Sequence, residues 1–138
     1  MSSELRSERL VLASYKLRIH DAHVRALPAR DEAGCPFAGP GVDLRGETAH
    51  AILGDAALIG PFRAWLEARE PGVTLRSVSV DLVARRVLIT LEPMTPDQRP
   101  RVVRIDPPHA EEVLASTAAL ENALIEACTL QLRRRSKS

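Results

Sequence analysis

His20 and His23 are the two histidines closest together in the chain, and a pair of imidazoles can bind a metal ion. Side chains three positions apart share one face of a helix, where both could reach the same cation, but they point to opposite faces of a strand. The residues before them alternate as a strand does, and no third ligand follows in register. We therefore expect two exposed turn histidines and no metal or other cofactor, with His20 and His23 as the metal candidates if the segment is helical.

Cys35 has the surroundings of an accessible thiol, because glycine and proline flank it in a predicted loop. A thiol becomes a nucleophile when a neighbouring base takes its proton, and His50 is the candidate base, with Asp43 or Asp55 to orient the imidazole. These residues are distant in the sequence, so only the fold can bring them together. The alternative is a loop cysteine without a catalytic role.

His109 is a third catalytic candidate, because it follows Asp106-Pro107-Pro108 at the predicted N-terminus of a helix. The helix dipole at that end favours the neutral imidazole that some catalytic histidines use, although an ordinary first-turn residue also fits the position. The chain contains no P-loop, G-x-G-x-x-G, G-x-S-x-G, H-E-x-x-H or C-x-x-C motif. This absence excludes the commonest nucleotide-binding, hydrolase and zinc-site classes, and we lean toward a protein that is not an enzyme.

Basic and acidic residues nearly balance, at 19 and 18, and leave a formal net charge of +1. They are unevenly distributed, since residues 73–104 carry six basic and three acidic groups, whereas residues 105–132 carry five acidic groups and no basic one. We favour the interpretation that acidic helices lie beside basic strands and neutralise them. In the alternative, the strand arginines bind an anion such as an acyl or phosphate group. These arginines are Arg76, Arg85, Arg86, Arg99, Arg101 and Arg104.

Neither nucleic acid nor a membrane is the expected partner. Aromatic residues make up 3% of the chain, and sheets that bind single strands use exposed aromatics as stacking platforms. The basic tail at residues 133–138 could contact phosphates, but a solvated helix end is the interpretation we favour, so a weak nucleic-acid binder is the third hypothesis. No apolar run reaches the roughly 18 residues that cross a bilayer, and the first residues lack the apolar core of a secretory signal. We expect a cytoplasmic protein.

Residues 10–20 fit two patterns of apolar side chains. Five odd-numbered apolar positions, from Val11 to Ile19, alternate with more polar residues and indicate a half-buried strand. A seven-residue spacing that includes Leu12 and Ile19 also fits a helix. We favour the strand, because five consecutive matches to alternation rarely arise by chance.

Residues 28–46 are predicted to form a long loop, since seven of them are glycine or proline. Loops of that length in compact domains usually serve a function, so we expect a partner or ligand contact there. Residues 47–69 are predicted to be helical, with an interruption at Gly60-Pro61 where a second helix begins. Alternation around residues 77–91 predicts an antiparallel hairpin, and a third strand follows at residues 102–105.

The segment from Pro107 to Arg134 is predicted to form one helix, about 40 Å long at about 1.5 Å per residue. A compact chain of this size has a diameter of about 37 Å, so the helix would span or overshoot its own domain. Either the sheet covers the apolar stripe along its whole length, or a second copy covers the far end in a symmetric dimer. The interface residues in the second case are Val113, Leu120, Leu124, Cys128 and Leu132.

Together these patterns predict one α+β domain over residues 1–138. Its antiparallel sheet is expected to have three to five strands, packed against two helical segments, one of them the long C-terminal helix. The leading functional hypothesis is a non-catalytic interaction or assembly module that associates with itself, as a homodimer, or with another protein. The alternative is a small-molecule-binding protein or enzyme that acts on an anionic acyl or phosphate ligand.

Overall fold

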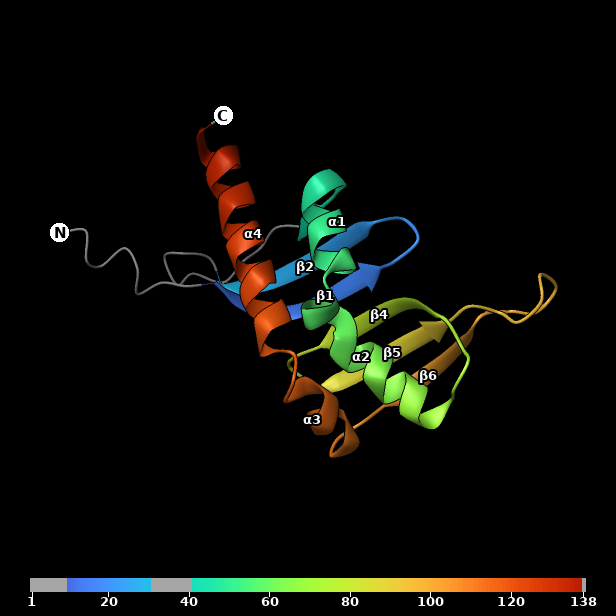
Figure 1. Ribbon diagram of the computed structural model, residues 1–138. Coiled ribbons are helices and arrows are strands. Elements are labelled where there is room, and N and C mark those ends of the chain that lie inside the picture. Colours follow the sequence, from blue (N-terminus) through green and yellow to red (C-terminus); the bar gives the residue numbers. More distant parts are fainter. Residues whose placement is uncertain (1–9, 31–40, 138) are drawn as a thin grey trace.

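The computed structural model describes residues 10–30 and 41–137, which form two successive blocks of strands followed by helices (Figure 1). Three strands precede two helices in each block. In chain order the elements are β1 (Val11–Arg18), β2 (His23–Arg30), β3 (Val42–Leu44), α1 (Gly46–Gly54), α2 (Ala56–Arg69), β4 (Leu75–Asp81), β5 (Arg86–Leu91), β6 (Arg101–Ile105), α3 (His109–Leu114) and α4 (Ala118–Lys137).

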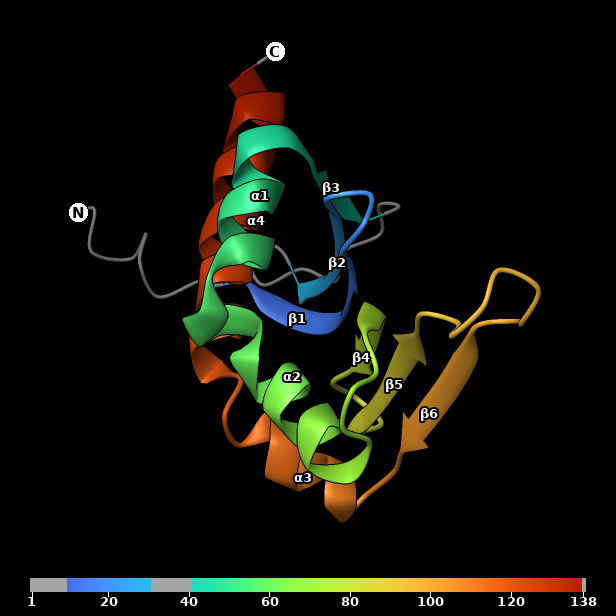
Figure 2. The same ribbon diagram turned by 45° about the vertical axis from the view of Figure 1, so that its right-hand side comes forward.

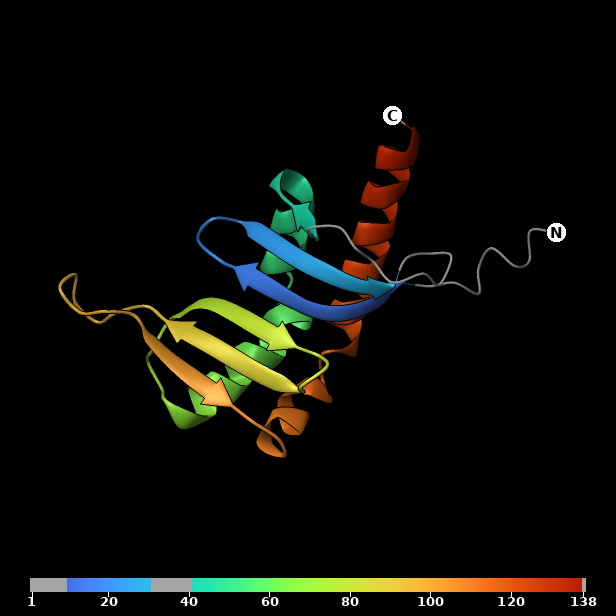
Figure 3. The same ribbon diagram turned by 180° about the vertical axis from the view of Figure 1, so that it is seen from behind.

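The six strands form one antiparallel sheet in the order β3-β2-β1-β4-β5-β6. Strands β1 and β4 join the two blocks at its centre. All four helices lie on one face of the sheet, as Figures 1 and 2 show. In Figure 3 the opposite face is turned to the viewer and no helix lies over it. We call this second face the uncovered face.

The core lies between the sheet and the helices, because successive residues of a strand point to opposite faces. On β5, Val87, Ile89 and Leu91 are buried under the helices, while Leu88 and Thr90 lie on the uncovered face and are half-buried. The largest fully buried side chains include Leu17, Ile59, Phe62, Ile89, Leu120 and Leu124. Strands and helices thus contribute to one continuous core.

Strand β1 confirms the alternation seen in residues 10–20, and the competing helix does not form. The predicted loop over residues 28–46 is wrong at both ends, because β2 continues to Arg30 and β3 occupies Val42–Leu44. Pro28 misled the prediction: it lies within β2, opposite Leu12, at a place where the register of the β1–β2 pairing shifts. Proline is tolerated at such irregularities. The rest of the predicted loop, residues 31–40, lies outside the described residues.

The predicted break at Gly60-Pro61 is also wrong, because Pro61 lies inside α2. The chain breaks instead at Asp55, between α1 and α2. The Asp55 carboxylate accepts a hydrogen bond from the backbone N–H of Ala57 at 2.8 Å. A carboxylate in this position satisfies an otherwise unpaired N–H of the first turn and so starts a new helix.

The predicted continuous C-terminal helix is two helices, α3 and α4. Between them, the backbone N–H groups of Ser116 and Thr117 bond to carbonyls three residues back, at 3.0 and 3.3 Å. The buried hydroxyl of Thr117 lies 3.0 Å from the Leu114 carbonyl and 3.0 Å from a Glu121 carboxylate oxygen. Such side-chain bonds compete with helical pairing and allow the chain to turn. The helical spacing of apolar residues in the sequence gives no sign of this turn.

The α+β class and the antiparallel sheet are confirmed, as are the hairpin of β4 and β5 and the third strand β6. The sheet has six strands rather than three to five, and four helices replace the two predicted segments. Within residues 10–30 and 41–137, no helix has both the length and the apolar character of a bilayer-spanning segment.

Candidate functional site

The residues predicted to act in catalysis do not meet in one place. His50 is exposed on α1, and His109 is exposed at the start of α3, at the other end of the helix layer (Figure 1). Asp55 accepts the hydrogen bond that starts α2, and Asp43 lies on β3 beside different partners. Cys35 lies outside the described residues. The described candidates therefore form no nucleophile–base pair.

The two metal candidates each pair with a different carboxylate. His20 contacts Glu92, and the His23 ring nitrogen Nε2 lies 2.7 Å from the Asp43 carboxylate, which Arg25 also contacts at 3.2 Å. Hydrogen bonding by His23, reinforced by the charge of Arg25, lowers the pKa of the Asp43 carboxyl below its ordinary value. In the described part of the chain, no three His, Cys, Asp or Glu side chains gather as a metal site would require.

Three of the strand arginines that were candidates for anion binding form hydrogen bonds with carboxylates of the same chain. Arg85 donates to both Glu111 oxygens, at 3.0 and 2.8 Å, and so ties the turn between β4 and β5 to α3. Arg86 and Arg104 donate to Asp106, at 2.8 and 2.9 Å. These hydrogen bonds lower the pKa values of the Glu111 and Asp106 carboxyls. The Asp106 carboxylate is thus bound by arginines and does not cap the next helix.

The remaining predicted arginines are spread over the sheet. Arg76 lies 3.7 Å from a Glu92 oxygen, and Arg101 contacts Glu70 at the end of α2. Arg99 is exposed in the connection between β5 and β6. The arginines do not converge on one point, and most of these pairs join a strand or its turn to a helix or to an acidic loop. This arrangement agrees with neutralisation inside the fold.

Four of the five predicted interface side chains belong to the core of a single chain. Val113 is 3% exposed, and Leu120, Leu124 and Cys128 are 0% exposed, while Leu132 is half-buried against them. The apolar stripe of α4 is covered within the chain, because α4 contacts β1, β3, α1 and α2. The reason for expecting a second copy along this stripe is therefore removed.

The uncovered face carries Arg86 and Arg104, which the sequence analysis named, together with Lys16, Ser14 and Ser79, which it did not name as site residues. Because paired strand residues point to the same side, one row of side chains runs across five strands. This row consists of Arg25, Lys16, Ser79, Leu88 and Arg104. Beside it runs a second row, which consists of Leu27, Ser14, Asp81 and Arg86. Once residues 10–20 are taken as a strand, their alternation places Lys16 on the other face of the strand from its buried neighbours.

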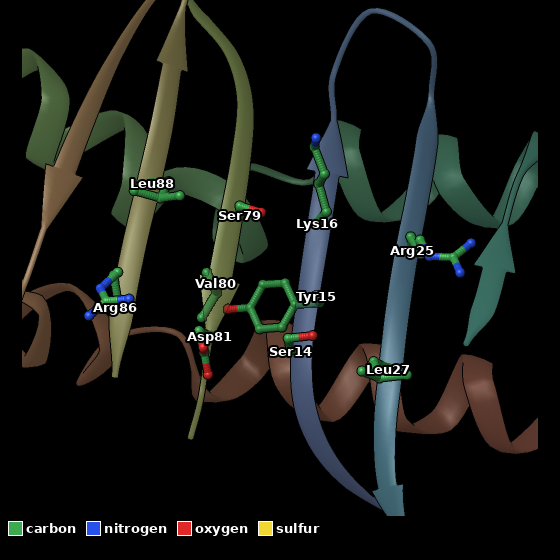
Figure 4. Close-up of a pocket in the computed structure, with 10 residues that line it drawn as sticks. All are labelled: Ser14, Tyr15, Lys16, Arg25, Leu27, Ser79, Val80, Asp81, Arg86 and Leu88. Atoms are coloured by element: carbon green, nitrogen blue, oxygen red, sulfur yellow. The ribbon is translucent and has the colours of Figure 1, made fainter. Parts of the chain in front are cut away.

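Two shallow depressions lie on this face. The first has a volume of about 390 Å³ and contains Ser14, Lys16, Ser79 and Leu88 (Figure 4). The second, of about 690 Å³, is lined by Lys16, Arg18, His20, Asp21, Arg76, Ser77, Thr90, Glu92 and Pro100. Since Lys16 lines both, the two depressions meet at its side chain. Together they form a groove along β1 and β4, which we call the Lys16 groove.

Tyr15 packs on the helix side of β1, beneath this groove. Its side chain is buried, and among the described residues its hydroxyl makes no hydrogen bond of ordinary geometry. Burial, together with the negative charge of Glu121, raises the pKa of Tyr15 above its ordinary value, while the Thr117 hydroxyl opposes this rise. A buried hydroxyl without a well-formed bond destabilises the fold, since it loses its hydrogen bonds to water.

Five basic side chains and three acidic ones line the Lys16 groove, the basic ones being Lys16, Arg18, Arg25, Arg76 and Arg86. The acidic groups have partners within the chain: Asp21 contacts Arg18, Glu92 contacts Arg76, and Asp81 accepts bonds from two backbone N–H groups. The basic excess is offset just outside the groove, because Arg25 contacts Asp43 and Arg86 donates to Asp106. Lys16 is therefore the groove cation that remains to attract an anion, and the described residues of the groove supply no nucleophile–base pair. Comparison of the chain with protein-family models, with curated proteins and with solved structures gave no match.

Proposed function

We propose that the chain is a non-catalytic protein-interaction module that binds its partner on the uncovered face of the sheet. The observation that carries this proposal is the asymmetry of the fold: within residues 10–30 and 41–137, all four helices cover one face of the sheet and none covers the other (Figures 2 and 3). The apolar stripe of α4 is buried against the sheet and the other helices, so a partner cannot reach it. The uncovered face, by contrast, carries exposed side chains on several neighbouring strands.

The shape of this face also supports binding over catalysis. Its depressions are half open to solvent, whereas small-molecule sites enclose most of their ligand. Neither depression contains His50 or His109. A broad face with paired charges at its margins and hydroxyls at its centre suits a protein partner, because interfaces combine a central contact patch with a polar rim.

A capture experiment with two matched variants tests the proposal. Ser79→Glu places an acidic side chain in the middle of the uncovered face, and Ala119→Glu places one on the exposed side of α4. We expect a partner protein, identified by mass spectrometry and confirmed by titration with purified components, to bind the original chain and Ala119→Glu but not Ser79→Glu. Loss of binding in Ala119→Glu alone would move the interface to the helix side and contradict the proposal.

A further inference from the structure

Lys16 stands out among the charged groups of the uncovered face. Each neighbouring arginine on this face contacts a carboxylate: Arg18 lies 2.6 Å from Asp21, and Arg25 lies 3.2 Å from Asp43. Within the described residues, the Lys16 ammonium forms no ion pair or hydrogen bond. It is exposed and lies at the centre of the sheet, on β1 next to β4.

Two hydroxyl groups lie on the same face as Lys16. Ser79 is the direct cross-strand neighbour of Lys16 on β4, and Ser14 lies two positions back along β1 on the same face. Figure 4 shows the Ser79 hydroxyl directed toward β1, while the Lys16 side chain extends along β1 away from Ser14 and Arg25 points toward β3. A positive charge with a hydroxyl donor on the neighbouring strand is a suitable environment for a carboxylate, which accepts hydrogen bonds from both kinds of group.

A second cation continues the pattern along the strand. Arg18 lies two positions beyond Lys16 and so projects from the same face, at a strand spacing of about 6.8 Å. Its contact with Asp21 joins two half-exposed side chains, so it is a weak surface pair that another carboxylate can replace. From Ser14 to Arg18 the groove extends over about 14 Å, which is the length of about four residues of extended chain.

The walls of the groove favour a protein segment over nucleic acid. Leu27 and Leu88 flank the first depression and offer apolar contact beside the charge. Tyr15 lines the first depression but is buried, so its ring offers no stacking surface. Phe62 is buried in the core, and Trp65 stacks against Arg69 on α2. Proteins that bind single-stranded nucleic acid need stacking platforms, which the described part of this face lacks.

We infer that the Lys16 groove binds an extended acidic segment of a partner protein, in which carboxylates at alternate positions lie against Lys16 and Arg18. Alternation matches the groove because residues two apart on an extended segment point the same way, with the same spacing as the two cations. Charge complementarity supports this occupant at Lys16, whose ammonium has no partner within the described residues, and at Arg18, whose pair with Asp21 is a weak surface contact. The inference rests on the proposed function and names the chemistry of its partner.

Two peptides of identical composition test the inference. Glu-Thr-Glu-Thr-Glu-Thr presents its three carboxylates on one side when extended, each two positions from the next, whereas in the block peptide Glu-Glu-Thr-Thr-Glu-Thr no two glutamates are two positions apart. Each carries a neutral fluorophore and is titrated with the full chain by fluorescence anisotropy at low ionic strength, where surface charge contacts are strongest. We expect the alternating peptide to bind several-fold more tightly than the block peptide. Equal binding would mean that net charge alone attracts the peptides and would overturn the inference.

Matched charge removals then locate the site. Lys16→Met keeps the length of the side chain and is expected to weaken binding of the alternating peptide about tenfold, as loss of one charge-assisted contact implies. Arg63→Met removes one positive charge from exposed α2 and is expected to change the affinity by less than about twofold. A similar loss in both variants would refute the assignment of Lys16. Melting curves verify that both variants are folded.

A third probe and the capture experiment separate the remaining outcomes. If a twelve-residue oligo-dT binds more tightly than the alternating peptide and loses affinity in Lys16→Met, the groove binds nucleic acid and the inference is wrong. If the peptides fail but Ser79→Glu still abolishes capture of a protein that Ala119→Glu retains, the interaction function stands and only the acidic-segment inference falls. If both the peptides and the capture fail, both proposals are refuted.

Discussion

Replacement of Leu124 by alanine distinguishes a core role of α4 from a role in self-association. The Leu124 side chain is 0% exposed in the single chain and packs in the core that the helices share with the sheet. Removal of a fully buried leucine costs about 2–5 kcal/mol, from lost transfer energy and the cavity left behind. We take about 3 kcal/mol as the expected loss in the free energy of unfolding, a central value in that range.

This loss converts into a melting-temperature shift. The unfolding entropy of a chain this long is about 0.3 kcal/mol per kelvin, so about 3 kcal/mol lowers the melting temperature by about 10 °C. The control is Leu130→Ala on the same helix, where the side chain is 54% exposed and the expected cost is below about 0.5 kcal/mol. Thermal melts by circular dichroism measure both variants.

The assay is repeated over a hundredfold range of protein concentration. If Leu124 is a core residue of the single chain, the difference between original and variant is the same at every concentration. A dimer held together by this helix face would instead have a melting temperature that rises with concentration. Sedimentation of Leu124→Ala as a folded, lighter species than the original chain would refute the core assignment and restore the interface.

Three further predictions concern buried or paired groups. Tyr15 is the only tyrosine of the chain, and because burial raises its pKa, its absorbance should show no ionisation near pH 10 and should change only when the protein unfolds. Tyr15→Phe removes a hydroxyl without a well-formed hydrogen bond and should leave stability unchanged or raise it by about 1 kcal/mol, whereas a loss would reveal a missed hydrogen bond. The Asp43 pKa is lowered in the fold, so its contribution to stability is present above the ordinary pKa of about 3.9 and lost as the pH falls through the folded value. Asp43→Asn should therefore melt with a weaker dependence on pH between pH 5 and 2, and an unchanged slope would show that the contact with His23 does not form. In a Cys35→Ser background the buried Cys128 thiol should react with a thiol reagent only on unfolding, and rapid reaction of the folded protein would contradict its burial.

The sequence predicted the elements that have local signals. Alternation in the sequence predicted strands where β1, β4 and β5 are found, and a short apolar run at residues 102–105 predicted the strand that is β6. The strand at residues 42–44 has no such signal, because three residues are too few for a period and their pairing with β2 comes from the fold. The division of the C-terminal helix was also hidden, since Ser116 and Thr117 fit a helical pattern and become a turn through hydrogen bonds to nearby carbonyls.

The candidate site was predicted less well than the fold, for a physical reason. Histidines, cysteines and clustered arginines attract attention in a sequence, but here the described ones are paired or separated by the topology. Lys16 appears ordinary until the strand order places β4 beside β1 and leaves that face without helices. The lack of an ion pair at Lys16 depends on the three-dimensional positions of its neighbours. These positions cannot be predicted from the spacing of residues in the sequence.

The most direct test of the account is to follow the backbone amide signals of the isotope-labelled chain by nuclear magnetic resonance while the alternating acidic peptide is added. The account predicts that the signals of Lys16, Arg18, Ser79 and their strand neighbours shift, while those on the exposed sides of α2 and α4 stay in place. Shifts confined to the helices, with none along β1 and β4, would contradict the claim that the uncovered face is the binding surface.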